Sequence, residues 1–209
     1  MEHTSLESVQ HTKYLGVMIS DDLRWNHRVA DITGRANKLL KLLRRNLSIC
    51  DRKVKEAAHL GLVRPLLEYA NQAWDPHTDN LSNEIKKIQR RTAHFVTSDY
   101  QNYELGSVTT LLKDLSWKSL TNRREGDRLC LLKKGLDHNA ILPLYELSRP
   151  ARKTRHIHHR YYTTIYAHTN IFKFSFVPRT IRDCNNLPHN VVEIMDDAKF
   201  HTLLLFTIL

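Results

Sequence analysis

Apolar residues recur every three or four positions through residues 25–47 of the chain. The series is Trp25, Val29, Ile32, Ala36, Leu39, Leu43 and Leu47. A stripe with this spacing covers one side of an amphipathic α-helix, and so long a helix has to bury the stripe against neighbouring elements. Asp21 and Asp22 precede the stripe, and their carboxylates are suited to cap the helix N-terminus. The pattern predicts a long helix within a helical bundle.

Two further helical patterns follow before residue 100. Asp51 is placed to cap a second helix, and Pro65 is expected to kink it because proline removes a backbone donor and clashes with the preceding turn. The apolar stripe of this helix is Val54, Ala58, Leu62, Leu66, Tyr69 and Ala73. A third helix over Leu81–Thr97 would bury Ile85, Ile88, Thr92 and Phe95. These patterns predict a three-helix bundle.

The rest of the chain is expected to be mixed. Lys13–Ser20 is apolar, with Gly16 inside it, and predicts a short strand. Ser107 and Ser116 are placed to cap a short helix and a longer one that ends near Leu136. The strings TTIYAH and FKFSFV suggest short strands or extended arms, with one late helix after them. The predicted units are residues 1–20 (strand region), 21–100 (bundle), 101–145 (second helical unit) and 146–209 (basic aromatic segment). The predicted fold class is mainly α.

The charge balance favours polyanionic partners. The chain has 32 Lys and Arg against 22 Asp and Glu, a formal net charge of +10. Coulomb attraction and counterion release then favour polyanions, a class that includes RNA, an RNA–DNA hybrid and duplex DNA. Ribosomal contact, an anionic membrane surface and simple solubility fit the same charge.

A basic aromatic stretch spans Arg149–Arg182. It holds eight Lys or Arg, four His and six aromatic residues without a single Asp or Glu. Arginine forks bind phosphates bidentately, and aromatic faces stack on unpaired bases for about 1–3 kcal/mol each. Phosphate contact is predicted for Arg152, Lys153, Arg155 and Arg160, whereas Phe172, Phe174 and Phe176 are expected inside a small core. Two helical clusters fit phosphate contact or a solvated face equally well: Arg44 with Arg45, and Lys86 with Lys87, Arg90 and Arg91.

Catalytic and metal sites find little support. Asp21–Asp22 and Asp196–Asp197 are the adjacent acid pairs, and both have the setting of a helix start. His156, His158 and His159 form an HIHH string, but cations surround it and no convergent third ligand can be assigned. Phosphate-loop, nucleophile-elbow and H-E-x-x-H motifs are absent. The sequence predicts no enzyme activity, metal or cofactor.

The expected compartment is nuclear or cytoplasmic, without secretion or membrane insertion. The three cysteines, Cys50, Cys130 and Cys184, are widely spaced and form no C-x-x-C pair, so a disulfide framework is not expected. MEHTSLESVQHTKYLG lacks the apolar core of a signal peptide. LLLFTIL is far too short to span a bilayer. RPARKTRHIHHR fits a nuclear entry signal or plain phosphate binding.

Five strings, in order along nearly the whole chain, resemble one family. They are KYLGVMISDDLRWNHRVADITGRANKLLKLLRRNL, LVRPLLEYANQAWDP, IKKIQRRTAHFVTSDY, LLKDLSWKSLTNRR and SFVPRTIRDCNNLP. The chain thus resembles the region downstream of the polymerase palm in non-LTR retrotransposon (LINE) reverse transcriptases, with jockey-like and chicken-repeat-like elements nearest. Cys184 stands where the family usually has an aromatic residue, and LLLFTIL also departs from its pattern.

The resemblance implies a thumb-like bundle that grips a template–primer duplex through cationic helices. Lys13 to Gly16 match the palm–thumb junction of the family. The helical cations that would contact phosphates are Arg44, Arg45, Lys86, Lys87, Arg90 and Arg91. The family's catalytic carboxylates and endonuclease lie upstream of the K-Y-L-G string, so no catalytic residue carries over.

Two other functions stay open. A protein partner could pair with the strand edge at KYLGVMIS, because an unpaired edge is a template for another strand. Trp25, Trp74 and Trp117 would be anchors if exposed, although core packing is the expected alternative. A translated remnant without a selected role is the remaining reading.

Overall fold

A computed structural model describes residues 8–100, 107–138, 147–151, 158–194 and 196–207. These ranges are mainly helical, which confirms the predicted fold class. The first elements are β1 (His11–Tyr14), β2 (Val17–Ser20), α1 (Asn26–Asn46), α2 (Arg52–Ala58), the π-helical segment η1 (His59–Val63), α3 (Arg64–Glu68) and α4 (Asp79–Thr97). They are followed by α5 (Ser107–Asp114), α6 (Leu120–His138), α7 (Asn170–Lys173), α8 (Phe176–Asn185), α9 (His189–Val192) and α10 (Asp197–Thr207).

The predicted N-terminal strand is a hairpin of two strands. β1 and β2 pair antiparallel, from His11 opposite Ser20 to Tyr14 opposite Val17. Leu15 and Gly16 form the turn with φ of 45° and 79°, the positive values that tight two-residue hairpin turns require. A single strand was therefore wrong, because Gly16 reverses the chain direction.

The buried Arg28 ties this hairpin to the helices. Its guanidinium donates to the Gly16 carbonyl at 3.0 Å and to the Tyr69 carbonyl at 3.2 Å. The Tyr69 hydroxyl donates to the Leu15 carbonyl at 2.9 Å. The hairpin turn is thus held from two directions by polar contacts that apolar periodicity does not predict.

The first long helix begins later than predicted. α1 starts at Asn26, and its N-cap residue Trp25 makes no side-chain capping bond. Asp21 and Asp22 instead accept from backbone N–H groups within their own turn, those of Asp22 and Arg24. The capping prediction for this acid pair is therefore wrong. The stripe itself is largely confirmed, because Val29, Ile32, Ala36 and Leu43 are buried. Leu40 is buried where Leu39 was predicted, and Trp25, Leu39 and Leu47 are partly buried against the same core.

The second predicted helix is α2, η1 and α3 in unbroken succession. Asp51 caps it as predicted, accepting from the Val54 N–H at 3.0 Å. Its wider π-helical turns precede Pro65, where the missing N–H and the ring would disturb a regular α-turn. The buried positions are Lys55, His59, Val63 and Leu67, one residue beyond the predicted stripe. The helix also ends at Glu68, five residues before the predicted end.

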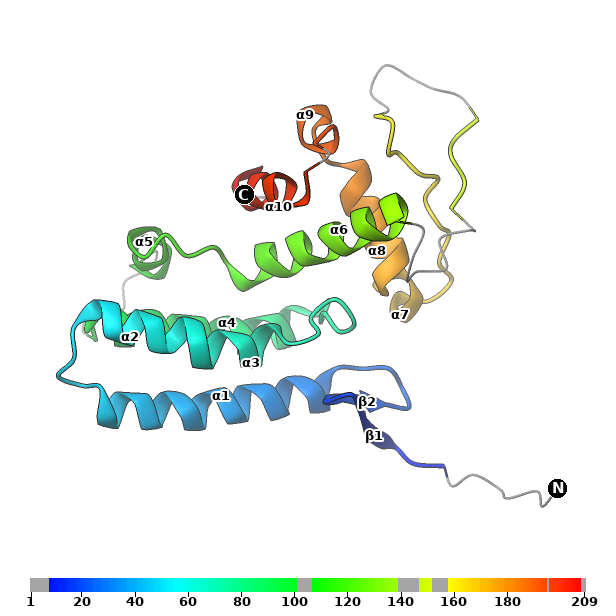
Figure 1. The fold of residues 1–209 in the computed structure, drawn as a ribbon. Coiled ribbons are helices and arrows are strands. Elements are labelled where there is room, and N and C mark those ends of the chain that lie inside the picture. The colour runs from blue at the N-terminus through cyan, green and yellow to red at the C-terminus, as the bar shows by residue number, and fades with distance from the viewer. Residues whose placement is uncertain (1–7, 101–106, 139–146, 152–157, 195, 208–209) are drawn as a thin grey trace.

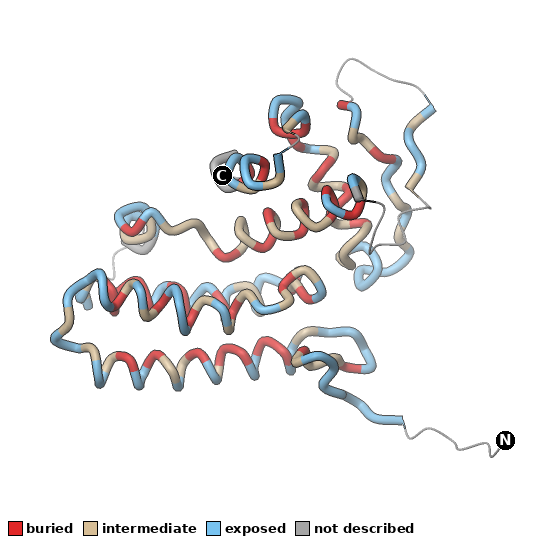
Figure 2. Tube along the Cα trace, in the orientation of Figure 1, coloured by how far each residue is buried: buried red, intermediate tan, exposed pale blue. Residues whose placement is uncertain are grey.

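The first core lies among α1, α4 and the continuous helical rod formed by α2, η1 and α3 (the α2–α3 rod). Figure 2 shows the buried residues of these helices facing inwards, and α4 buries Ile85, Ile88, Thr92 and Phe95 as predicted. Trp74 is fully buried, and its indole donates to the Tyr69 carbonyl at 2.8 Å. Leu115 and Leu120 extend this core to the end of α5 and the start of α6.

A second core forms between the later part of α6 and the C-terminal helices, which Figure 1 shows packed beside it. Its buried apolar residues are Leu129, Leu132, Cys184, Leu187, Val191, Val192, Phe200 and Leu204. FKFSFV lies in α7 and α8 instead of a strand, and TTIYAH has no regular structure. The short-strand predictions there were wrong: within the described ranges the strands all precede residue 21.

Candidate nucleic-acid interface and an interior ion network

The cationic cluster predicted on the third helix lies on the solvent side of α4. Lys86, Lys87, Arg90 and Arg91 are all exposed, while the positions between and after them are buried against the first core. Lys87 pairs with Glu84 at 2.6 Å, one turn earlier. From Ile85 to the end of α4 the sequence contains no acidic residue, so the outer side of this helix is almost uniformly positive.

Helix α1 brings a second cationic stripe to the same place. Arg91 donates to the side-chain oxygen of Asn37 at 2.8 Å, and Arg44 donates to the Arg91 carbonyl at 2.9 Å. Arg44 also lies over the ring of Tyr100, with its guanidinium carbon 5.7 Å from the ring centre. These contacts align the polar edge of α1 with that of α4.

Two exposed lysines that were not predicted from the sequence, Lys38 and Lys41, complete this surface. Lys38, Lys41 and Arg45 are exposed and follow one another at steps of three and four along α1. Beyond Asp31, α1 has no acidic residue. The basic face is defined as Lys38, Lys41, Arg44, Arg45, Lys86, Lys87, Arg90 and Arg91. The signal for the added lysines was present in the helical spacing of the cations.

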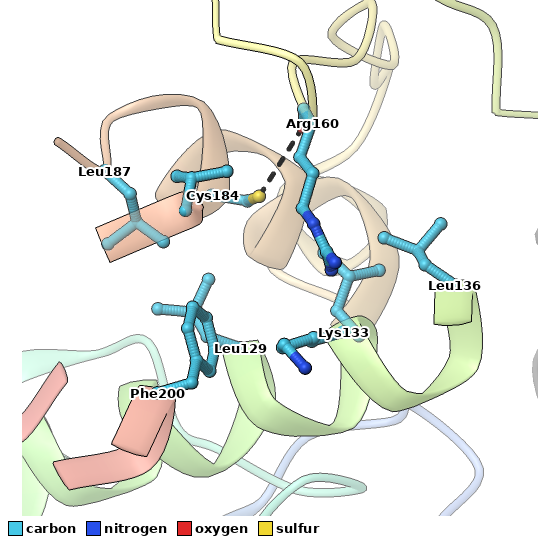
Figure 3. A pocket seen from close by; sticks show the side chains of 9 residues that line it. Leu129, Lys133, Leu136, Arg160, Cys184, Leu187 and Phe200 are labelled. Atoms are coloured by element: carbon cyan, nitrogen blue, oxygen red, sulfur yellow. Dashed lines mark hydrogen bonds between the residues drawn. The ribbon is translucent and has the colours of Figure 1, made fainter. Parts of the chain in front are cut away.

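The other predicted phosphate ligands lie elsewhere. Arg152, Lys153 and Arg155 fall outside the described residues. Arg160 is only 12% exposed and pairs with Asp137 at 2.8 Å. In Figure 3 its side chain reaches across a small cavity in the second core towards α6. Little of this guanidinium is left for a phosphate, so Arg160 does not belong to the basic face.

The histidine string does not assemble a described metal centre. His158 is buried, and its Nε2 lies 3.0 Å from the Cys184 carbonyl oxygen. Burial lowers its pKa. His159 is exposed, and His156 lies outside the described residues. Across the described ranges no group of three or more His, Cys, Asp or Glu side chains is placed to hold a metal ion.

The thiols and the second acid pair have structural roles. Burial raises the pKa of Cys130 to about 12 and that of Cys184 to about 11, which keeps both thiols protonated at neutral pH. Asp196 accepts from the Lys199 N–H at 2.7 Å and so caps α10, as predicted for this acid pair.

The aromatic residues of FKFSFV are less buried than predicted. Phe172 is 46% exposed, and Phe174 and Phe176 are half-buried. Phe174 stacks on His77, with ring centres 4.3 Å apart and planes 3° from parallel. The short turns of α7 bring these rings to the surface of the molecule, so the predicted interior position was wrong for Phe172.

An interior ion network joins the two cores. The Asp75 carboxylate receives three arginines: Arg128 directly, Arg179 at 3.1 Å and Arg124 at 3.5 Å. Arg128 also contacts Asp183 at 2.8 Å. The side chains of Asp75, Arg124 and Arg128 are at most 6% exposed. Because these partners are roughly 50 to 100 residues apart in sequence, no local pattern predicts the network.

Burial dominates the electrostatics of this network. It lowers the pKa of Arg124 and Arg179, and it raises the pKa of the neighbouring Glu125, with Asp183 adding to that rise. The Nε atoms of Arg124 and Arg128 are buried without a hydrogen-bond partner. Three arginines thus share the acids of this network, with Asp75 at its centre and Asp183 and Glu125 beside it.

Comparison with known proteins gives no match: no family model, curated protein or solved structure is similar to this chain. The resemblance to reverse transcriptases therefore stays a prediction from the sequence. None of the described helices is long and apolar enough to cross a membrane.

Proposed function

We propose that this chain binds RNA or an RNA–DNA duplex through phosphates, without sequence preference, using the basic face of α1 and α4. In this proposal the chain is the C-terminal part of a non-LTR retrotransposon reverse transcriptase and grips a duplex as a thumb does. It contributes no catalytic carboxylate, because those of the resembled family lie upstream of the K-Y-L-G string. The proposed activity is binding alone.

One observation carries this proposal. Two long helices, α1 and α4, pack side by side, and each presents exposed Lys and Arg over several turns. No acidic residue follows Asp31 in α1 or Glu84 in α4. Cations at steps of three and four along a helix can follow a phosphate backbone. Such contacts position a nucleic acid and supply affinity, but they do not read its sequence.

The matching experiment is fluorescence anisotropy of the full chain with a labelled RNA–DNA hybrid, single-stranded RNA and duplex DNA at several salt concentrations. Each phosphate contact that is lost lowers the salt slope by about 0.9 for a duplex. Lys86→Ala with Arg90→Ala should therefore lower the slope by about 1.8 and weaken binding to all sequences alike.

A matched control removes two exposed cations from other faces. Lys53 of α2 and Lys113 of α5 are exposed, so Lys53→Ala with Lys113→Ala loses the same charge at a different place. This control should keep the wild-type slope. Equal effects of the two double variants would reduce the finding to net charge, and absence of binding at low salt by a folded sample would end the proposal.

A protein partner at the hairpin is the second candidate. Tyr14, Leu15 and Tyr69 are 64%, 75% and 54% exposed and lie together at the hairpin turn. Every residue of β1 is also exposed. Leu15→Asp would disturb such a surface without touching the basic face. A partner captured by the wild type and lost by this variant, with nucleic-acid binding unchanged, would favour this function.

A further inference from the structure

A cleft of about 670 Å³ lies beside the hairpin, away from the basic face. Residues from five regions line it: β2, the start of α1, the loop before α4, α6 and the α7–α8 turn. Clefts of roughly 300–1,000 Å³ are the usual size of small-molecule sites. The accessible surface of the cleft is mainly apolar, as is typical of such sites, although many of its lining residues are polar or charged.

Three helices begin at the wall of this cleft. Trp25 and Asn26 start α1, Thr78 and Asn80 start α4, and Ser175 starts α8, and all five residues line the cleft. None of the three N-cap residues makes a side-chain capping bond. The first N–H groups of a helix lack partners within it, and the helix dipole adds partial positive charge there. The helix starts therefore favour an anion.

Two arginines of the interior ion network bring guanidinium groups to the same cleft. Arg128 and Arg179 line it, with side chains 3% and 18% exposed. Arg128 also pairs with Asp183 at 2.8 Å, and Asp183 lies outside the lining. Asp75 is the opposing carboxylate in the lining, and three arginines already contact it. Arg24, which is largely exposed and lies 3.7 Å from Asp22, adds a further guanidinium at the cleft.

Flat aromatic side chains provide the remaining wall. His77 and Phe174 stack in parallel, and both line the cleft together with Trp25 and Phe176. Aromatic faces stack on nucleobases regardless of base identity. Positive charge and aromatic faces thus meet within one cavity, the combination that recognises an anionic ligand with a planar ring.

We propose that this cleft binds a nucleotide, with its phosphate at the helix starts and arginines and its base against the aromatic wall. The nucleotide is either free or the terminal residue of a strand, since both present the same groups. This site is separate from the basic face and does not depend on the proposed function.

Isothermal titration of the full chain with adenosine monophosphate, inorganic phosphate and adenosine tests the assignment. Adenosine monophosphate should bind at least tenfold more tightly than either part alone, because only the nucleotide engages both walls. A 5′-phosphorylated RNA tetramer forms the fourth arm. A tetramer that binds more tightly than both the mononucleotide and the same tetramer without its 5′-phosphate assigns a strand end, and mononucleotide binding without this gain assigns a free nucleotide; both support the site.

Asn26→Asp with Asn80→Asp is the informative variant. It places two near-isosteric carboxylates at the starts of α1 and α4, where acidic residues stabilise a helix. Nucleotide affinity should fall at least tenfold while the unfolding midpoint stays equal or rises. Lys86→Ala with Arg90→Ala on the basic face is the matched control and should leave nucleotide binding unchanged.

Three results would overturn the proposal. They are no nucleotide binding by folded wild-type protein, equal affinity for nucleotide and inorganic phosphate, and wild-type affinity in the Asn26→Asp, Asn80→Asp variant. The mononucleotide makes no use of the basic face, so failure here leaves the duplex-binding experiment untouched.

Discussion

The first core packs apolar side chains from α1, the α2–α3 rod and α4, whereas the junction with the second core depends on a buried ion network. The first core has helical periodicity written in the sequence, as at Ile32 and Ile88. The junction joins Asp75 to arginines of α6 and α8 that are remote in sequence. Burial of apolar surface is non-directional, but a buried carboxylate needs specific partners. The two regions should therefore respond differently to substitution.

Asp75→Ala should produce the largest loss of stability. It leaves Arg124, Arg128 and Arg179 without their shared carboxylate, and breaking a buried ion pair from one side costs about 3–5 kcal/mol. Urea unfolding followed by circular dichroism measures this cost. The exposed pair of Asp31 and Arg35 is the control, where Asp31→Ala should cost less than about 1 kcal/mol. Equal costs would mean that the network adds little.

Leu67→Ala tests the apolar side of the comparison and the register of the second helix. Leu67 is fully buried in the first core, so its truncation should cost about 2–5 kcal/mol. Leu62 is 50% exposed on the same rod, and Leu62→Ala should cost under about 0.5 kcal/mol. The same unfolding measurement on both variants decides the register. A larger cost at Leu62 would restore the stripe predicted from the sequence.

Acid should weaken the first core through His59. Burial lowers the pKa of His59 to about 4, and Arg64 and Arg123 add to this effect. The unfolded chain takes up a proton below about pH 6.5 that the folded chain refuses until about pH 4. Stability should therefore fall by about 2 kcal/mol between pH 7.5 and 5, since one pKa unit corresponds to about 1.4 kcal/mol.

His59→Phe provides the control for this pH dependence. Phenylalanine keeps an aromatic ring against Trp117, which stacks on His59 with ring centres 4.1 Å apart, but it cannot take up a proton. Urea midpoints at pH 7.5 and pH 5 should differ less in this variant than in the wild type. An unchanged pH dependence would assign the acid sensitivity to other groups.

The smallest expected effect separates surface cations from interior ones. Arg90→Ala should lower the salt slope of duplex binding by about 0.9 and leave stability nearly unchanged. Arg160→Ala should leave the salt slope unchanged and lower stability, because its guanidinium is paired with Asp137 at the second core. Anisotropy and urea unfolding on both variants measure the two quantities. A loss of nucleic-acid affinity in Arg160→Ala without loss of stability would return Arg160 to the interface.

Local pattern predicted the helices well and the use of charge poorly. The stripe at Val29, Ile32 and Ala36 and the cap at Asp51 follow from residues close in sequence. The same reasoning could not predict that Arg160 pairs with Asp137 of α6, or that Arg179 pairs with Asp75 in the loop after α3. The stretch Arg149–Arg182 contains no acid of its own, but the fold brings acidic residues from other elements to its arginines, which are then less available to phosphate.

Single-residue register was the other limit of sequence reasoning. In the second helix the stripe Val54, Ala58, Leu62 and Leu66 has the same spacing as the one that is buried. The buried stripe includes Lys55 and His59, whose polar ends find partners or stack, so hydrophobicity alone selected the wrong side. The prediction of a single strand across Gly16 was wrong for a related reason, because in so short a segment a glycine at a hairpin turn cannot be told from a glycine within a strand.

Helix α6 belongs to both cores, with Leu120 in the first and Leu129 and Leu132 in the second. A rigid element shared in this way transmits loss of order from one half of the molecule to the other. Heating should therefore give one cooperative transition, with equal calorimetric and van't Hoff enthalpies. A version of the chain truncated after α6 would expose the apolar side of the last turns of α6, and we expect such a fragment to self-associate.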